Sequence, residues 1–101
     1  MADFDCLDML KALADRTRLR IVKVLLAGPL SVNEIVEGVG ASQYNVSKHL
    51  RVLRQAGIAE VEPSGTRRHY AIAASFRRKL ARQGNVLDLG CCRFDFDKLP
   101  D

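Results

Sequence analysis

The three cysteines carry the most reactive side chains in this chain of 101 residues. Cys91 and Cys92 are adjacent near one end of the sequence, and Cys6 lies near the other. An odd number of cysteines without secretory features argues against a structural disulfide framework and favours reduced thiols suited to metal or redox chemistry. The alternative is that they are small buried apolar side chains.

The second chemically notable feature is a basic block in the middle of the chain. Residues 41–82 carry nine basic and two acidic side chains, whereas residues 1–40 carry five basic and six acidic ones. Residues 83–101 carry two basic and four acidic side chains. A basic segment between neutral or acidic ones indicates a surface that binds a polyanion, with a solvated charged face as the alternative.

Length and composition limit the classes of protein. A chain of 101 residues with 48% hydrophobic residues predicts one folded domain, too small for a two-domain enzyme. Without a plausible catalytic constellation, we expect no enzymatic activity. No apolar run approaches the ~20 residues that span a bilayer. Asp3 and Asp5, not basic residues, precede the first apolar stretch, so we expect no signal peptide and a cytoplasmic protein.

Apolar residues at helical spacing predict four helices before Gly57. Side chains that can accept hydrogen bonds from free helical N–H groups precede these helices, namely Asp3 or Asp5, Asp15, Ser31 and Ser42. Ser31 and Glu34 fit a capping box. The second helix should end at Gly28-Pro29, residues 38–41 should form a tight turn, and Gly57 should end the fourth helix.

The pattern changes after Gly57. Residues 58–62 and 67–72 predict a β-hairpin around a turn at residues 63–66, with Tyr70 and Ile72 facing inward. A basic helix should cover residues 75–83. Residues 86–96 alternate only weakly, which indicates an extended or irregular segment.

Two short helices joined by a glycine-containing turn and followed by a basic hairpin predict a winged helix-turn-helix, a mainly α fold with a small β-hairpin wing. A helix fits the major groove of DNA, where amide side chains can pair with base edges. The candidate DNA-reading residues are Gln43, Tyr44, Asn45, Ser47 and Lys48. His49 would contact a phosphate or bond to the backbone, and Arg67 and Arg68 would hold DNA from the wing.

Three segments, residues 13–21, 46–57 and 65–72, resemble the ArsR/SmtB repressors. The resemblance implies a homodimer that binds double-stranded DNA at an operator near its own gene, with the first and last helices at the dimer interface. It also implies an inducer, often a metal or metalloid, that releases the DNA. A two-fold dimer predicts an inverted repeat with half-sites ~34 Å apart. Residues 1–84 would form the DNA-binding and dimerisation domain, and residues 85–101 a C-terminal tail.

The family's familiar effector sites are not preserved in this sequence. One such site is a Cys-x-Cys pair in the helix before the recognition helix, which is the helix that carries the candidate DNA-reading residues. Here that stretch is residues 30–36, and it contains no cysteine. The last helix lacks the family's histidine-containing zinc site, because His49 and His69 both lie in the DNA-reading part. Any sensing must therefore use other residues.

Cys91 and Cys92 are the remaining candidates for an effector site. Trivalent arsenic and antimony are soft ions that prefer thiolates, and As(III) takes three of them. The resemblance implies that the first and last segments meet in the dimer, so that Cys6 could supply the third thiolate, from the same or from the partner subunit. We therefore expect As(III) or Sb(III) as inducer and no required cofactor.

Other readings of the cysteines stay open. One is a redox switch that responds to an oxidant or a persulfide, in which Cys6 bridges to Cys91 or Cys92 across the dimer. A zinc site with Asp88 or Asp95 is less natural, because zinc usually takes four ligands. From a different functional class, the domain would be a winged-helix module that binds another protein.

Overall fold

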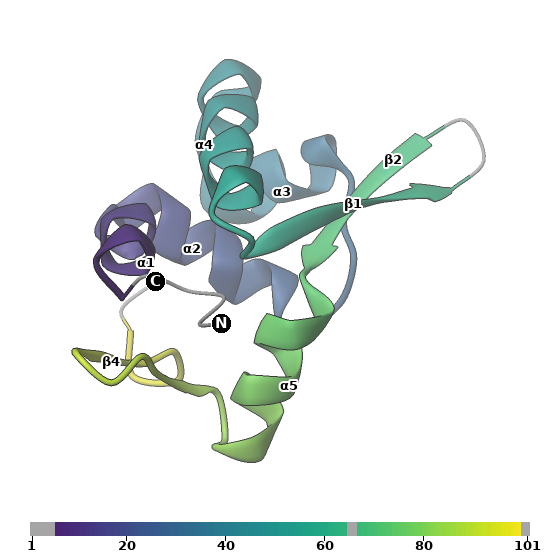
Figure 1. Ribbon diagram of the computed structural model, residues 1–101. Coiled ribbons are helices and arrows are strands. Elements are labelled where there is room, and N and C mark those ends of the chain that lie inside the picture. Colours follow the sequence, from purple (N-terminus) through teal and green to yellow (C-terminus); the bar gives the residue numbers. More distant parts are fainter. Residues whose placement is uncertain (1–5, 65–66, 100–101) are drawn as a thin grey trace.

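The computed structural model describes residues 6–64 and 67–99 of the chain. Four helices lead into a hairpin, which is followed by a fifth helix and a second, smaller hairpin (Figure 1). In chain order the elements are α1 (Cys6–Leu13), α2 (Arg16–Leu25), α3 (Val32–Val39), α4 (Gln43–Gln55), β1 (Ala59–Ser64), β2 (Arg67–Ile72), α5 (Ala74–Arg82), β3 (Val86–Asp88) and β4 (Arg93–Asp95). The predicted winged helix-turn-helix is confirmed, with α3 and α4 as the helical pair and β1–β2 as the wing.

Side-chain caps define where three of the helices begin. Asp15 accepts a hydrogen bond from the backbone N–H of Arg18 at 3.0 Å and starts α2. Ser31 and Glu34 form both hydrogen bonds of the capping box at α3, and Ser42 accepts from Asn45 N–H at 3.1 Å at α4. These predicted caps are confirmed, whereas the expected caps of the first helix, Asp3 and Asp5, lie outside the described residues.

Glycines with positive φ follow α3 and α4. Gly40 has φ 72° and caps α3, which continues through Gly38 to Val39. The tight turn predicted at residues 38–41 is therefore wrong in its first half, because the left-handed residue that ends the helix is Gly40. Gly57, with φ 78°, follows Ala56 and ends α4 as predicted.

One apolar core joins the helices to the wing and to the C-terminal tail. Val46, Leu50 and Leu53, the stripe predicted for the fourth helix, are at most 1% exposed. Leu87, in the middle of β3, and Phe96, directly after β4, are fully buried in the same core. The tail is therefore an integral part of the folded domain.

The wing is attached to the helices by backbone hydrogen bonds. Strands β1 and β2 are antiparallel, with Ala59 opposite Ile72 and Ser64 opposite Arg67. Leu30, just before α3, donates to Tyr70 O at 2.9 Å and accepts from Tyr70 N–H at 2.8 Å. As predicted, Ile72 is buried and Tyr70 packs against the core. The first strand extends two residues beyond its predicted end, and turn residues 65–66 lie outside the described part.

The segment expected to be extended or irregular forms a short antiparallel hairpin. Leu87 in β3 pairs with Phe94 in β4. In Figure 1 this hairpin lies near α1, on the opposite side of the molecule from the outer end of α4. Within the described ranges, no helix has the length and apolar character needed to cross a membrane.

Candidate thiol site and nucleic-acid interface

The fold brings all three cysteines together within one chain. Cys6 is the first residue of α1, and Cys91 and Cys92 lie in the turn between β3 and β4. Their three sulfur atoms lie within 4.8 Å of one another. Cys6 and Cys91 form a disulfide, with α-carbons 6.3 Å apart, and the sulfurs of Cys91 and Cys92 are 4.0 Å apart. The expectation of three unlinked thiols is wrong for this structure, because the tail folds back onto α1.

Local hydrogen bonds fix the turn that presents Cys91 and Cys92. The carboxylate of Asp88 accepts from Gly90 N–H at 2.9 Å, and Leu89 N–H donates to Cys92 O at 2.9 Å. Gly90 has φ 89°, a conformation that side-chain-bearing residues rarely adopt. The backbone conformation of the turn therefore favours glycine at the position before the cysteine pair.

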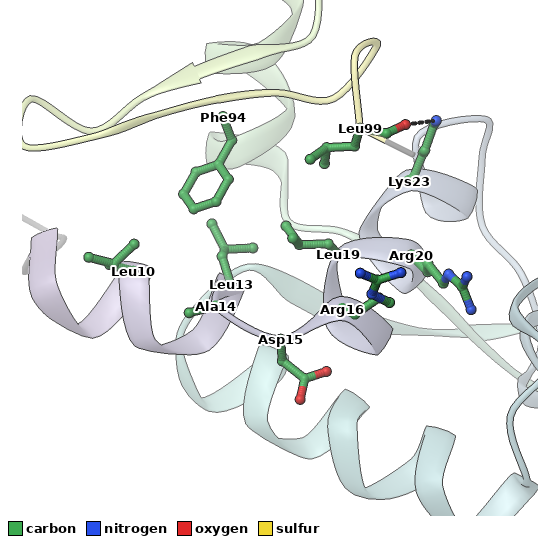
Figure 2. Close-up of a pocket in the computed structure, with 10 residues that line it drawn as sticks. All are labelled: Leu10, Leu13, Ala14, Asp15, Arg16, Leu19, Arg20, Lys23, Phe94 and Leu99. Carbon is green, nitrogen blue, oxygen red and sulfur yellow. Dashed lines mark hydrogen bonds between the residues drawn. The ribbon is translucent and has the colours of Figure 1, made fainter. Parts of the chain in front are cut away.

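The tail is also held against α1 and α2 beyond the cysteines. A hollow of about 360 Å³ lies between Leu10 and Leu13 of α1, Leu19 of α2, and Phe94 and Leu99 of the tail. Figure 2 shows Phe94 and Leu99 pointing toward these leucines from above. On the far side of Leu19, the ammonium group of Lys23 donates to Leu99 O at 2.9 Å. This packing sets the position of the turn relative to Cys6.

The donor set suits a soft ion with three ligands. Among the described residues, the cluster consists of Cys6, Cys91 and Cys92 and includes no carboxylate or imidazole. The two carboxylates proposed as zinc ligands, Asp88 and Asp95, lie outside this cluster, and each accepts a hydrogen bond from a nearby backbone N–H. Three thiols without a fourth ligand fit pyramidal As(III) or Sb(III) better than tetrahedral zinc. Such binding requires the Cys6–Cys91 disulfide to be reduced.

The recognition helix α4 presents its predicted DNA-reading residues to solvent. Tyr44 is 75% exposed, and the ammonium group of Lys48 lies 5.9 Å from the centre of its ring. The other exposed members of the set are Gln43, Asn45 and Ser47. On the wing, Arg68 is exposed, whereas the side chain of Arg67 lies outside the described part. The first turn of α4 is therefore exposed enough to enter the major groove of DNA.

His49 differs from the other residues proposed to read DNA. It is half-buried, and its Nδ1 lies 3.1 Å from the guanidinium of Arg18 in α2. The partner found here is a side chain, and not the backbone group that the sequence suggested. Asp15 lies near both residues. Burial alone would raise the pKa of Asp15, but the hydrogen bond from Arg18 N–H and the charge of the Arg18 guanidinium bring this pKa below its ordinary value.

Comparison with known proteins decides the family. Residues 15–61 match the model of bacterial regulatory proteins of the arsR family. A probable mercury resistance operon repressor of Streptomyces lividans is 34% identical over 89 residues, which cover 81% of this chain and 70% of that protein. The chain belongs to the ArsR family. The family model describes bacterial regulatory proteins, and several relatives of this chain are named HTH-type transcriptional regulators.

Two further proteins are similar to this ArsR-family chain, one in sequence and one in structure. The HTH-type transcriptional regulator Rv2034 of Mycobacterium tuberculosis is 45% identical over 62 residues, 61% of this chain and 58% of that protein. The chain thus spans little more than half the length of this curated relative. The homodimeric winged helix-turn-helix DNA-binding domain Mb0332 of Mycobacterium bovis is 32% identical, with a TM-score of 0.68, over 75% of this chain and 71% of that one.

Sequence reasoning missed the role of Arg18 in this ArsR-family fold. In the sequence, Arg18 is one of four cations in the second helix, which also contains Arg16, Arg20 and Lys23. A signal was present on the partner helix, since His49 follows Val46 by three residues and precedes Leu53 by four. A polar residue at the edge of a buried stripe is expected to meet a neighbouring element.

Proposed function

We propose that this protein is a DNA-binding transcriptional repressor that leaves its operator when Cys6, Cys91 and Cys92 bind trivalent arsenic or antimony. The observation that carries the proposal is the grouping of three sulfurs within 4.8 Å, on elements away from the recognition helix. A thiol site in that position suits an inducer better than a direct contact to DNA.

The DNA half of the proposal is supported by charge and exposure. Residues 41–82, which include α4, the wing and α5, carry nine of the sixteen lysines and arginines. Gln43 and Asn45 lie in the exposed first turn of α4, where amide groups can pair with adenine edges in the major groove. Arg68, which is exposed on the wing, is proposed to bind phosphate.

The repressor is proposed to act as a homodimer on an inverted repeat. The structurally similar domain Mb0332 is described as homodimeric. Leu7 of α1 is 64% exposed, an apolar side chain on the helix that the family places at the dimer interface. Two recognition helices related by a two-fold axis would contact half-sites ~34 Å apart.

Thiol oxidation is a second candidate signal, favoured by the Cys6–Cys91 disulfide itself. Two thiols would give up two protons and two electrons as the S–S bond forms. A hydroperoxide would accept them, with cleavage of its O–O bond to release water and an alcohol, or two waters from hydrogen peroxide. The same disulfide would withhold two of the three ligands from arsenic.

Two binding measurements test this proposed function. Fully reduced protein should bind one arsenic atom per chain, seen as a new sulfur–arsenic absorption band and by elemental analysis. Cys91→Ser should lose this binding, whereas Ala81→Ser, an exposed substitution on α5, should keep it. Retention of stoichiometric arsenic by Cys91→Ser would contradict the site.

The DNA arm uses a labelled duplex from upstream of the protein's own gene. Binding should be tight and should weaken steeply with salt, because basic residues displace counterions from phosphates. Salt-independent capture of a protein partner, without DNA binding, would instead support an interaction module.

A further inference from the structure

We propose that Arg18 is the positioning residue that transmits the state of the thiol site to the recognition helix. The inference rests on the proposed function and specifies how its two sites communicate. It is carried by one side chain that contacts the end of α1 and the middle of α4 at the same time.

On one side, Arg18 holds the C-terminal end of α1. Its Nε donates to Ala12 O at 2.6 Å, and one terminal nitrogen donates to Lys11 O at 3.3 Å. The last carbonyl groups of a helix lack partners within the helix and carry the negative end of its dipole. A guanidinium at this point therefore fixes α1 by hydrogen bonds and by charge.

On the other side, Arg18 holds α4 through His49. The second terminal nitrogen lies 3.1 Å from His49 Nδ1. A guanidinium has only donors, so Nδ1 must be the acceptor and the ring proton resides on Nε2. His49 directly follows Lys48 and is two residues from Ser47, so a shift of the helix at His49 moves residues proposed to contact DNA.

Helix α1 connects Arg18 to the thiol site. Cys6 begins this helix and Ala12 lies in its last turn, a rise of roughly 9 Å along one rigid element. Three free thiols, a Cys6–Cys91 disulfide and one As(III) bound by all three sulfurs each set a different distance between Cys6 and the tail. The core holds the tail through Leu87 and Phe96 and also holds α1 through Leu13, so both elements adjust, and the terminal carbonyls of α1 move relative to Arg18.

Coupling between two sites is measured as a ratio of affinities. The readout is therefore the dissociation constant for DNA with arsenite divided by that without it, on fully reduced protein. The variants are Arg18→Gln, which removes the guanidinium group, and His49→Leu, which removes the hydrogen-bond acceptor Nδ1. His49→Asn is the conservative variant, because its amide oxygen can replace Nδ1. Arg16→Gln, exposed on the same turn, is the matched control.

We expect wild type and Arg16→Gln to show a ratio of at least ~5, the lower range of allosteric coupling. Arg18→Gln and His49→Leu should bring this ratio to within about twofold of one while still binding one arsenic per chain. His49→Asn should keep most of the coupling. The double variant Arg18→Gln/His49→Leu should match either single variant, because both cut one connection.

An Arg18→Gln protein that binds arsenite and releases DNA like wild type would overturn the inference alone and leave the proposed function intact. If Arg18→Gln does not fold, as judged by circular dichroism, the comparison of His49→Leu with His49→Asn tests the inference instead. Equal DNA affinity ratios for these two variants would refute the positioning role of Arg18. If neither arsenite nor the Cys6–Cys91 disulfide changes DNA affinity in wild type, no signal exists to transmit. The proposed release mechanism and the inference then both fail.

Discussion

Cys6 and Cys91 are separated by 85 residues in the sequence, yet their α-carbons lie 6.3 Å apart in the fold. The link joins the start of the first helix to the tail hairpin and so encloses almost the whole domain. A cross-link that closes so long a loop restricts the unfolded chain far more than the folded one.

Oxidation should therefore stabilise the domain. Chain-entropy arguments give roughly 4–5 kcal/mol for a loop of this length, a value that native-state strain can reduce. Urea unfolding of the oxidised and the dithiothreitol-reduced protein measures the difference. Cys92→Ser should retain the gain and Cys6→Ser should abolish it. Equal stability of oxidised and reduced wild type would contradict the observed pairing.

The tail hairpin contains two phenylalanines that differ in burial, so the cost of removing each can be compared. Phe96 is fully buried, whereas Phe94 is half-buried at the hollow. Phe96→Ala should cost about 3–5 kcal/mol in the free energy of unfolding, because it leaves a cavity in the core. Phe94→Ala should cost clearly less. Comparable losses for both, measured by urea unfolding of the reduced protein, would mean that Phe96 does not anchor the tail in the core.

Asp15 should make stability depend on pH at the acid end. Its pKa in the folded protein lies below the ordinary value of 3.8. Its charge thus stabilises the fold above about pH 3.8, and this contribution disappears as the pH falls through the folded pKa. Asp15→Asn, which keeps a capping oxygen, should be less stable than wild type at pH 6, with a difference that vanishes in acid.

The matched control for Asp15 is Asp8→Asn, at an exposed position of α1. The stability difference between this control and wild type should vary less with pH. Asp15→Ala, which also loses the cap, should cost about 1 kcal/mol at neutral pH. A constant difference between Asp15→Asn and wild type from pH 6 into acid would refute the electrostatic contribution.

Lys48 should contribute one ionic contact to DNA. Lys48→Ala should weaken binding and lower the slope of log affinity against log salt by about 0.9, the expectation for one phosphate contact. Lys98→Ala, exposed in the tail, should leave both quantities close to wild type. Fluorescence anisotropy over a range of salt concentrations gives affinity and slope together, and an unchanged slope would exclude Lys48 from the phosphate contacts.

Local rules predicted the helical part of the fold well. The caps Asp15, Ser31 and Ser42 act over three residues, and the stripe at Val46, Leu50 and Leu53 follows the helical repeat, so both are encoded in short segments. The tail was harder to predict, because its strands have only three residues each and their alternation is correspondingly weak.

The sites depend on longer-range contacts. The sequence suggested that Cys6 joins Cys91 and Cys92 only through the family resemblance, which brings the first and last segments together and leaves open whether Cys6 comes from the same or the partner subunit. The structure brings them together in one chain through the packing of Leu87 and Phe96. The contact between Arg18 and His49 joins residues 31 positions apart. The place of His49 beside the buried stripe indicates a contact with another element, but no local pattern identifies Arg18 as the partner.

The most direct test of the account is the DNA affinity of the fully reduced protein with and without one equivalent of arsenite, measured by anisotropy on the upstream duplex. The account predicts that arsenite releases the DNA, that a dithiol chelator restores binding, and that Cys91→Ser stays bound throughout. Reduced protein that binds arsenite at its three cysteines and still holds DNA with unchanged affinity would contradict the claim that this thiol site controls repression.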